Sequence, residues 1–124
     1  MARKTSESVR IIGGKWRSRQ LTFTPTEGLR PTGSRIRETL FNWLAPYIEG
    51  ASCLDLFSGS GSLCFEALSR GAKNCTALEN NRAAISQLNS NKTLLNAVNL
   101  NIIAADTHSF LNKIQQKPSM MWFF

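Results

Sequence analysis

The chain has 124 residues, of which 42% are hydrophobic, and it carries a formal net charge of +7. A chain of this length predicts one globular domain, because it buries roughly two-thirds of the surface that its unfolded form exposes. No apolar run approaches the roughly 18–20 residues that cross a bilayer, and the first ten residues lack the apolar core of a secretory signal. We therefore expect a cytoplasmic protein that is not bound to a membrane.

The positive charge is concentrated near the N-terminus. The first nineteen residues hold six of the fifteen basic residues but only one of the eight acidic ones. A basic end on a nearly balanced body favours a polyanionic partner, although a tail that only aids solubility is the alternative. Residues 1–8 are polar and without periodicity, which predicts a disordered basic tail.

Residues 9–23, VRIIGGKWRSRQLTF, predict a β-hairpin. Gly13 and Gly14 suit the positive φ angles of a two-residue turn. The expected return strand interleaves an aromatic side chain with cations, a pattern suited to RNA phosphates, in Lys15, Trp16, Arg17 and Arg19. Trp16 can either stack on a base or pack in the core. Residues 9–33 are thus expected to form a hairpin and loop that contact RNA.

A helix is predicted after a loop that contains two prolines and two glycines. Ser34 is its expected N-cap, and Pro46 marks its expected end. Helical spacing predicts one buried apolar face, made of Ile36, Leu40, Trp43, Leu44 and Tyr47.

The remaining sequence alternates between strands and helices. We expect strands at residues 52–57, 74–79, 100–106 and 120–124, with helices at 62–70, 82–98 and 107–114. This alternation predicts a doubly wound α/β fold around a parallel sheet. The last strand is expected at an edge with uncovered apolar faces.

Cysteine usage favours a reducing compartment. Cys53, Cys64 and Cys75 form no CxxC pair and have no nearby histidine, so buried reduced thiols are expected rather than a disulfide or a zinc site. His108 likewise has no partner motif, and no metal is expected.

The stretch CLDLFSGSGSLCFEALSRGA, residues 53–72, predicts a backbone loop that receives a ligand between a strand and a helix. A P-loop requires Gly-Lys-Ser/Thr, but Ser62 and Leu63 follow Gly61. A dinucleotide site usually has a third glycine where this chain has Cys64. The third candidate is S-adenosylmethionine.

Three acidic residues near the ends of consecutive strands favour S-adenosylmethionine. Asp55, two residues before Phe57, can meet the cationic methionine end of the cofactor. Glu79 can accept both ribose hydroxyl protons, although dinucleotide enzymes use the same device. Asp106 can accept a hydrogen bond from the adenine amino group. The alternative is that the three acids are only helix N-caps.

These motifs, with VRIIGGKWRSRQL and GLRPTGSRIRETLFNWL, resemble the bacterial 16S rRNA guanine-N2 methyltransferase family (RsmD) from about Val9 to the chain end. The resemblance implies a Rossmann-like, three-layer methyltransferase fold with an N-terminal hairpin, and a cofactor domain over residues 34–124. It implies S-adenosylmethionine as cofactor and 16S rRNA, in the small ribosomal subunit or its assembly intermediate, as partner. The implied cofactor residues are Asp55, Phe57, Gly59, Gly61, Glu79 and Asp106. Further implied RNA contacts, beside the hairpin cations, are Arg30, Thr32, Arg35 and Arg37.

In that family an Asn/Asp-Pro-Pro-Phe/Tyr motif follows the fourth strand, where it orients the guanine amine and stacks on the flipped base. This sequence ends at KPSMMWFF without the motif, so no catalytic residue is assigned. We expect a truncated or frameshifted gene product, or a fragment, without the C-terminal half of the fold. The expected function is methylation of guanine N2 in 16S rRNA. The alternatives are a non-catalytic cofactor- or RNA-binding remnant and a nicotinamide-dependent oxidoreductase fragment.

Overall fold

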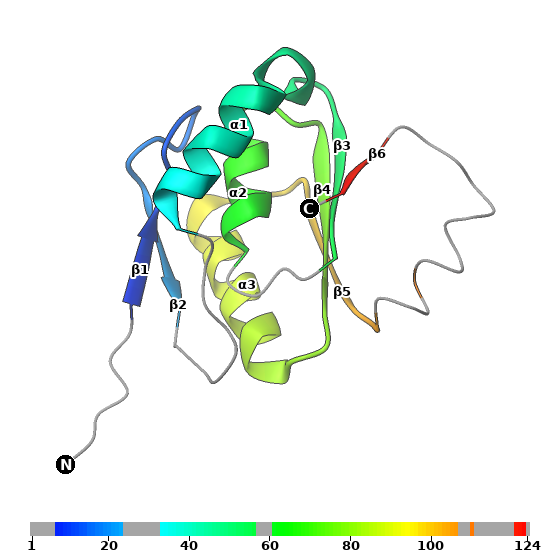
Figure 1. The fold of residues 1–124 in the computed structure, drawn as a ribbon. Coiled ribbons are helices and arrows are strands. Elements are labelled where there is room, and N and C mark those ends of the chain that lie inside the picture. The colour runs from blue at the N-terminus through cyan, green and yellow to red at the C-terminus, as the bar shows by residue number, and fades with distance from the viewer. Residues whose placement is uncertain (1–6, 24–32, 57–60, 107–109, 111–120, 124) are drawn as a thin grey trace.

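A computed structural model of the chain describes residues 7–23, 33–56, 61–106, 110 and 121–123 (Figure 1). The elements in chain order are β1 (Glu7–Arg10), β2 (Gln20–Phe23), α1 (Ser34–Ile48), β3 (Ser52–Asp55), α2 (Ser62–Ser69), β4 (Asn74–Glu79), α3 (Arg82–Leu95), β5 (Leu100–Ala104) and β6 (Met121–Phe123). In the described part of the chain, no helix is both long and apolar enough to cross a membrane.

Four of the strands form a parallel sheet in the order β5-β4-β3-β6. Strand β3 pairs with β4 on one side and with β6 on the other, so the last strand lies at a sheet edge as the sequence predicts. The strand–helix alternation therefore gives the expected parallel α/β fold, and all of these strands end at the same edge of the sheet.

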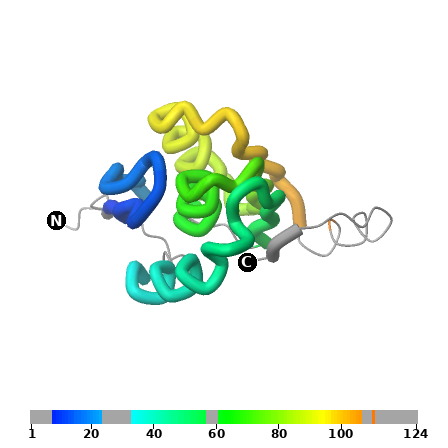
Figure 2. The backbone as a smooth tube through the Cα atoms, turned by 90° about the horizontal axis from the view of Figure 1, so that it is seen from above, coloured from blue at the N-terminus to red at the C-terminus, as the bar shows by residue number. Residues whose placement is uncertain are grey.

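The helices α1, α2 and α3 cover one face of this sheet, and the β1–β2 hairpin lies on the outer side of the helices (Figures 1 and 2). The core cluster lies between the sheet and the helices, and Phe65 of α2, Leu88 of α3 and the strand residues Cys53, Cys75 and Leu100 are fully buried in it. Small strand residues at this interface let the helices approach the sheet closely.

The hairpin is present, but its connection is not a two-residue turn. Strands β1 and β2 are antiparallel, with Arg10 paired to Gln20, so residues 11–19 form the connection. The Ile11 amide donates to the Arg19 carbonyl at 2.8 Å, and the Ser18 amide donates to the Ile11 carbonyl at 2.8 Å. The prediction of a turn at Gly13-Gly14 was wrong because these glycines pack against α2, as described below.

The buried face of α1 also differs from the prediction. The buried residues are Arg37, Phe41 and Ile48, with Leu40 and Leu44 partly buried beside them. Three members of the expected apolar face are instead mostly exposed: Ile36 (65%), Trp43 (73%) and Tyr47 (60%). The helix starts at Ser34 with Gly33 as its N-cap, and it continues through Pro46 to Ile48.

Several element boundaries shift by a few residues. Strand β1 begins at Glu7, within the segment expected to be disordered. Helix α3 ends at Leu95 rather than near residue 98, because Asn96 adopts a left-handed conformation (φ 53°) that stops the helix. The helix expected at 107–114 lies outside the described residues apart from Phe110.

Candidate cofactor site and RNA-facing surface

The carboxyl ends of β3, β4 and β5 bring the three predicted acidic residues to one edge of the sheet. Asp55 is the last residue of β3 and is 1% exposed, and Glu79 is the last residue of β4 and is 9% exposed. Asp106 lies two residues after β5 and is exposed. Because parallel strands end on the same side, this arrangement creates an acidic edge of the kind at which α/β folds bind ligands.

Gly61 makes the turn from this edge into α2. It is the N-cap of α2 and has a left-handed conformation, with φ 81° and ψ 8°. A Cβ atom at this position would collide with the side chains of Leu88 and Phe65, so both the backbone angle and the packing require glycine. The other two loop residues predicted to contact the cofactor, Phe57 and Gly59, lie outside the described residues.

Glu79 organises the turn between β4 and α3. Its Oε2 atom accepts hydrogen bonds from the amides of Asn80 at 3.1 Å and Asn81 at 2.9 Å. The N-cap of α3 is Asn81, whose side chain accepts from the Ala84 amide at 3.0 Å. Glu79 is therefore not the cap of α3, and its carboxylate is held in a defined position at the strand end.

The thiols of Cys64 and Cys75 lie next to each other, and the Cys64 thiol lies close to Asp55. The sequence did not predict this arrangement. The Cys64 Sγ atom lies 3.7 Å from Asp55 Oδ2 and 2.6 Å from Cys75 Sγ. Burial is the main reason that the pKa of Cys64 lies well above its ordinary value, with Cys75 and Asp55 contributing. All three cysteines are buried free thiols, which confirms that part of the prediction.

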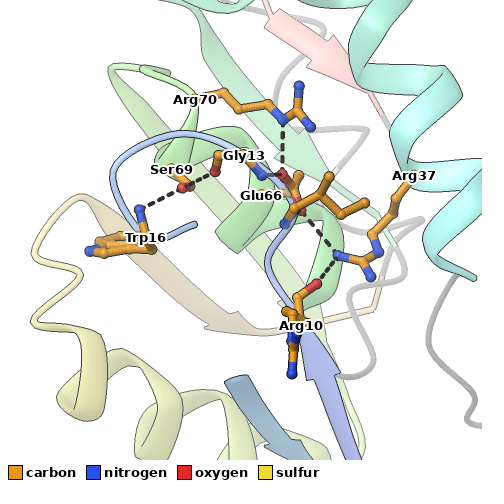
Figure 3. Close-up of polar contacts among 8 residues, drawn as sticks. Arg10, Gly13, Trp16, Arg37, Glu66, Ser69 and Arg70 are labelled. Carbon is orange, nitrogen blue, oxygen red and sulfur yellow. Dashed lines mark hydrogen bonds and ion pairs between the residues drawn. The ribbon is translucent and has the colours of Figure 1, made fainter. Parts of the chain in front are cut away.

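The cations predicted to contact RNA divide into exposed and buried groups. Lys15, Arg17, Arg19 and Arg35 are exposed. Arg37 is 1% exposed, and its Nη1 atom lies 3.1 Å from Glu66 Oε1 and 3.0 Å from the Arg10 carbonyl oxygen (Figure 3). Its guanidinium is thus held against the interior, and the RNA contact of Arg37 stays a prediction. Arg30 and Thr32 lie outside the described residues.

Trp16 packs in the core rather than facing solvent. Its side chain is 9% exposed, and its ring makes an edge contact with Phe65 at a centroid distance of 6.4 Å. The Lys15 ammonium lies 4.6 Å from the centre of the Trp16 ring, a favourable cation–π distance. Of the two readings of Trp16, the structure supports core packing.

Two residues of α2 that the sequence analysis did not single out hold the hairpin connection in place. Glu66 is fully buried and accepts hydrogen bonds from the Ile12 amide at 3.0 Å and the Gly13 amide at 2.9 Å (Figure 3). Ser69 accepts from the Trp16 amide at 2.9 Å. The available signal was a single charged residue in a helix whose other residues are uncharged and mostly apolar, because a buried carboxylate requires partners.

The described residues contain no group of three or more histidine, cysteine, aspartate or glutamate side chains that could hold a metal ion. A carboxylate such as Glu79 can accept from two ribose hydroxyls, and a buried carboxylate such as Asp55 can face a cationic group.

Comparison with known proteins identifies the family. Residues 9–124 match the family model described as "Conserved hypothetical protein 95". The chain is 52% identical to Ribosomal RNA small subunit methyltransferase D of Escherichia coli K12 over 106 residues, covering 86% of this chain and 54% of the relative. It is 50% identical to the Haemophilus influenzae protein of the same name, covering 89% of this chain and 58% of the relative.

Solved structures also resemble this chain in fold. The yhhF protein from Escherichia coli has a TM-score of 0.77 and 48% identity, and the match covers 85% of this chain and 56% of that one. A SAM-dependent methyltransferase from Agrobacterium tumefaciens has a TM-score of 0.73 at 18% identity, covering 99% of this chain and 40% of that one, which shows the shared fold. The chain spans about half the length of these relatives. It belongs to the RsmD family of ribosomal RNA small subunit methyltransferases.

Proposed function

We propose that this chain is the cofactor-binding and RNA-facing part of an enzyme that methylates the N2 amine of a guanine in 16S rRNA. The observation that carries the proposal is the convergence of Asp55 and Glu79, both buried, beside the Gly61 turn. S-adenosylmethionine, when bound, supplies a methyl group on a sulfonium centre that is already a good electrophile. The residues of this chain bind and orient it.

Each acidic residue has a distinct proposed role. Glu79 accepts hydrogen bonds from the ribose hydroxyls, and Asp55 faces the cationic methionine end. Asp106 accepts from the adenine amino group. Phe57, Gly59 and Gly61, which lie between β3 and α2 in the sequence, are assigned to cofactor contact. The matched family and the SAM-dependent fold of a structural neighbour support these assignments.

The RNA side of the proposal rests on charge. Lys15, Arg17, Arg19 and Arg35 are exposed cations, which suits contacts to phosphates. The relatives are named as small-subunit rRNA methyltransferases, and we assign the same RNA to this chain as partner. Since rRNA is methylated where ribosomes are assembled, the proposed location is the cytoplasm.

Calorimetric titration of the chain with S-adenosylhomocysteine tests cofactor binding. Glu79→Gln is expected to weaken affinity about tenfold, the loss of roughly one charge-assisted hydrogen bond. Glu38→Gln, which changes an exposed glutamate of α1, is the matched control and is expected to leave affinity unchanged. Binding of NADH instead of S-adenosylhomocysteine would support the oxidoreductase alternative and contradict the proposal.

Methyl transfer separates the enzyme from a non-catalytic remnant. Radiolabelled S-adenosylmethionine is incubated with the chain and with small-subunit particles that lack the modification. Because the sequence has no Asn/Asp-Pro-Pro-Phe/Tyr motif, we expect cofactor binding with little transfer by this chain alone. Transfer well above background would show that this chain orients the amine by residues not assigned here.

A further inference from the structure

A cavity of about 560 Å³ lies between β1, the hairpin connection and the first turn of α1, and none of the strand-end acids is among its lining residues. Its polar lining consists of three arginines and three serines, namely Arg10, Arg17, Arg37, Ser8, Ser18 and Ser34. No acidic side chain is among its described lining residues. We propose that this cavity binds a backbone phosphate of RNA together with its adjoining ribose, an inference that rests on the proposed function.

The charge around the cavity favours an anion. Arg10 and Arg17 are exposed and add two guanidinium groups to the lining. Arg37 and Arg70 share a single carboxylate, Glu66, at 3.1 Å and 2.8 Å. These two guanidinium groups and one carboxylate together keep a net positive charge next to the cavity. Guanidinium groups bind phosphate oxygens with good geometry and remain charged at any physiological pH.

The walls of the cavity are held in place before any ligand binds. The Ser18 amide donates a hydrogen bond to the Ile11 carbonyl at 2.8 Å, and Arg37 Nη1 donates one to the Arg10 carbonyl at 3.0 Å. In the described residues no side chain caps the start of α1, and its first turn contains no acid. Amide groups at this helix start add to the attraction of the arginines for an anion.

Size and surroundings favour RNA over a free phosphate ion. The volume lies in the range of sites that bind small organic ligands and exceeds the space one phosphate fills. Among the apolar lining residues, Ile12 is partly exposed and offers packing for a sugar. Lys15 and Arg19 extend the positive surface along the same connection, so a polyanion passing over the cavity meets further cations.

The first experiment maps small anions on the full chain by amide NMR, with inorganic phosphate and uridine 5′-monophosphate as probes. The nucleotide is expected to shift the amides of Ser18, Gly33 and Ser34, with larger changes than phosphate alone. Arg17→Gln is expected to remove these shifts. Arg19→Gln, an equal loss of charge on the same connection but outside the lining, is expected to retain them. Shifts elsewhere, or none, would overturn the proposal.

The second experiment measures affinity for a short fluorescein-labelled oligouridylate over a salt series. Relative to Arg19→Gln, both Arg17→Gln and Arg10→Gln are expected to bind about tenfold more weakly. Each is also expected to flatten the salt slope by about one. If the Arg17 and Arg19 variants weaken binding equally, RNA contacts only a diffuse basic surface and the cavity proposal fails. If phosphate binds but the RNA affinity of Arg17→Gln is unchanged, the assignment to RNA fails.

Failure of the cavity proposal can be distinguished from failure of the proposed function. Arg17→Gln is expected to keep the wild-type affinity for S-adenosylhomocysteine, because Arg17 is not one of the proposed cofactor residues. Absence of cofactor binding by the wild-type chain would contradict the proposed function. The anion and RNA binding measurements at the cavity could still be interpreted in that case. Thermal unfolding of each variant confirms that the compared proteins are folded.

Discussion

Glu66 and Arg37 form an ion pair of 3.1 Å whose side chains are 0% and 2% exposed. Arg70 donates to the other carboxylate oxygen at 2.8 Å, and the amides of Ile12 and Gly13 donate to the same carboxylate. This single carboxylate therefore joins α1, α2 and the hairpin connection (Figure 3). Gly61 is the N-cap of α2, so the same helix begins at the proposed cofactor site and supports the RNA-facing hairpin connection.

Glu66→Gln is expected to lower the free energy of unfolding by about 3–5 kcal/mol, because it leaves the buried Arg37 guanidinium without its counter-charge. Urea denaturation measures the loss. Glu38→Gln removes an exposed glutamate and is expected to change stability by less than about 0.5 kcal/mol. Equal losses in the two variants would show that the network does not stabilise the fold.

Gly14→Ala is expected to be strongly destabilising. Gly14 has φ 81°, and a Cβ atom there would overlap the backbone carbonyl of Ser69. Gly50→Ala is the matched control, since Gly50 has φ 78° but nothing within 4 Å of the added atom. The control should cost about 1–2 kcal/mol from the backbone angle alone. Thermal unfolding of both variants measures the two losses of stability, and their difference reports the contact between the hairpin connection and α2. A loss in Gly14→Ala no larger than that in Gly50→Ala would contradict this contact.

Phe41 and Trp43 test which face of α1 is buried. Phe41→Ala is expected to destabilise the chain by about 3–5 kcal/mol, because Phe41 is fully buried and lies under the Arg70 guanidinium at 5.4 Å. Trp43→Ala is expected to cost less than about 1 kcal/mol, because Trp43 is 73% exposed. Chemical denaturation of the two variants gives the comparison, and the opposite order would restore the face that the sequence predicts.

The error on α1 has an identifiable cause. Helical spacing in residues 34–48 fits more than one apolar stripe, and the buried stripe contains a charged residue, Arg37. A charged residue argues against burial unless its partner is known, and the partner Glu66 lies 29 positions away in sequence. Local periodicity contains no information on such a pairing. By contrast, the strands were predictable because each is a short apolar run bounded by turn residues.

The same reasoning explains the hairpin connection. Gly13 and Gly14 are typical of a tight turn, but their role is to let the backbone approach Ser69 and Glu66 of α2. This requirement arises from a contact 53–56 residues distant in sequence. The strand-end acids Asp55 and Glu79 could be predicted because the topology of a parallel sheet fixes where strands end. The thiols next to Asp55 could not, because their contact depends on the packing of α2 on β4.

Thiol reactivity is expected to report unfolding. Burial, with a contribution from Cys75, raises the pKa of the Cys53 thiol to about 12 from an ordinary value of 9.0. Between these values the unfolded chain has lost a proton that the folded chain keeps, so the free energy of unfolding should fall as pH rises above about 9. At neutral pH the native chain should not react with Ellman's reagent, whereas the chain in urea should react fully. Ser90→Cys places a thiol at an exposed position of α3 and is the positive control.

Rapid reaction of the native wild-type thiols, as fast as that of the Ser90→Cys variant, would contradict the buried placement of all three cysteines. Stability that is constant or rises between pH 9 and 11 would contradict the raised pKa of Cys53.

The central claim is that the nucleoside of S-adenosylmethionine binds where β3, β4 and β5 end, beside the Gly61 turn. Amide NMR titration of the full chain with S-adenosylhomocysteine tests it directly. The account predicts shifts confined to Gly61, Ser62, Asn80 and Ala105 and their neighbours, and weaker binding in Glu79→Gln. Shifts clustered around the arginine-lined cavity instead, or no shifts at saturating ligand, would contradict it.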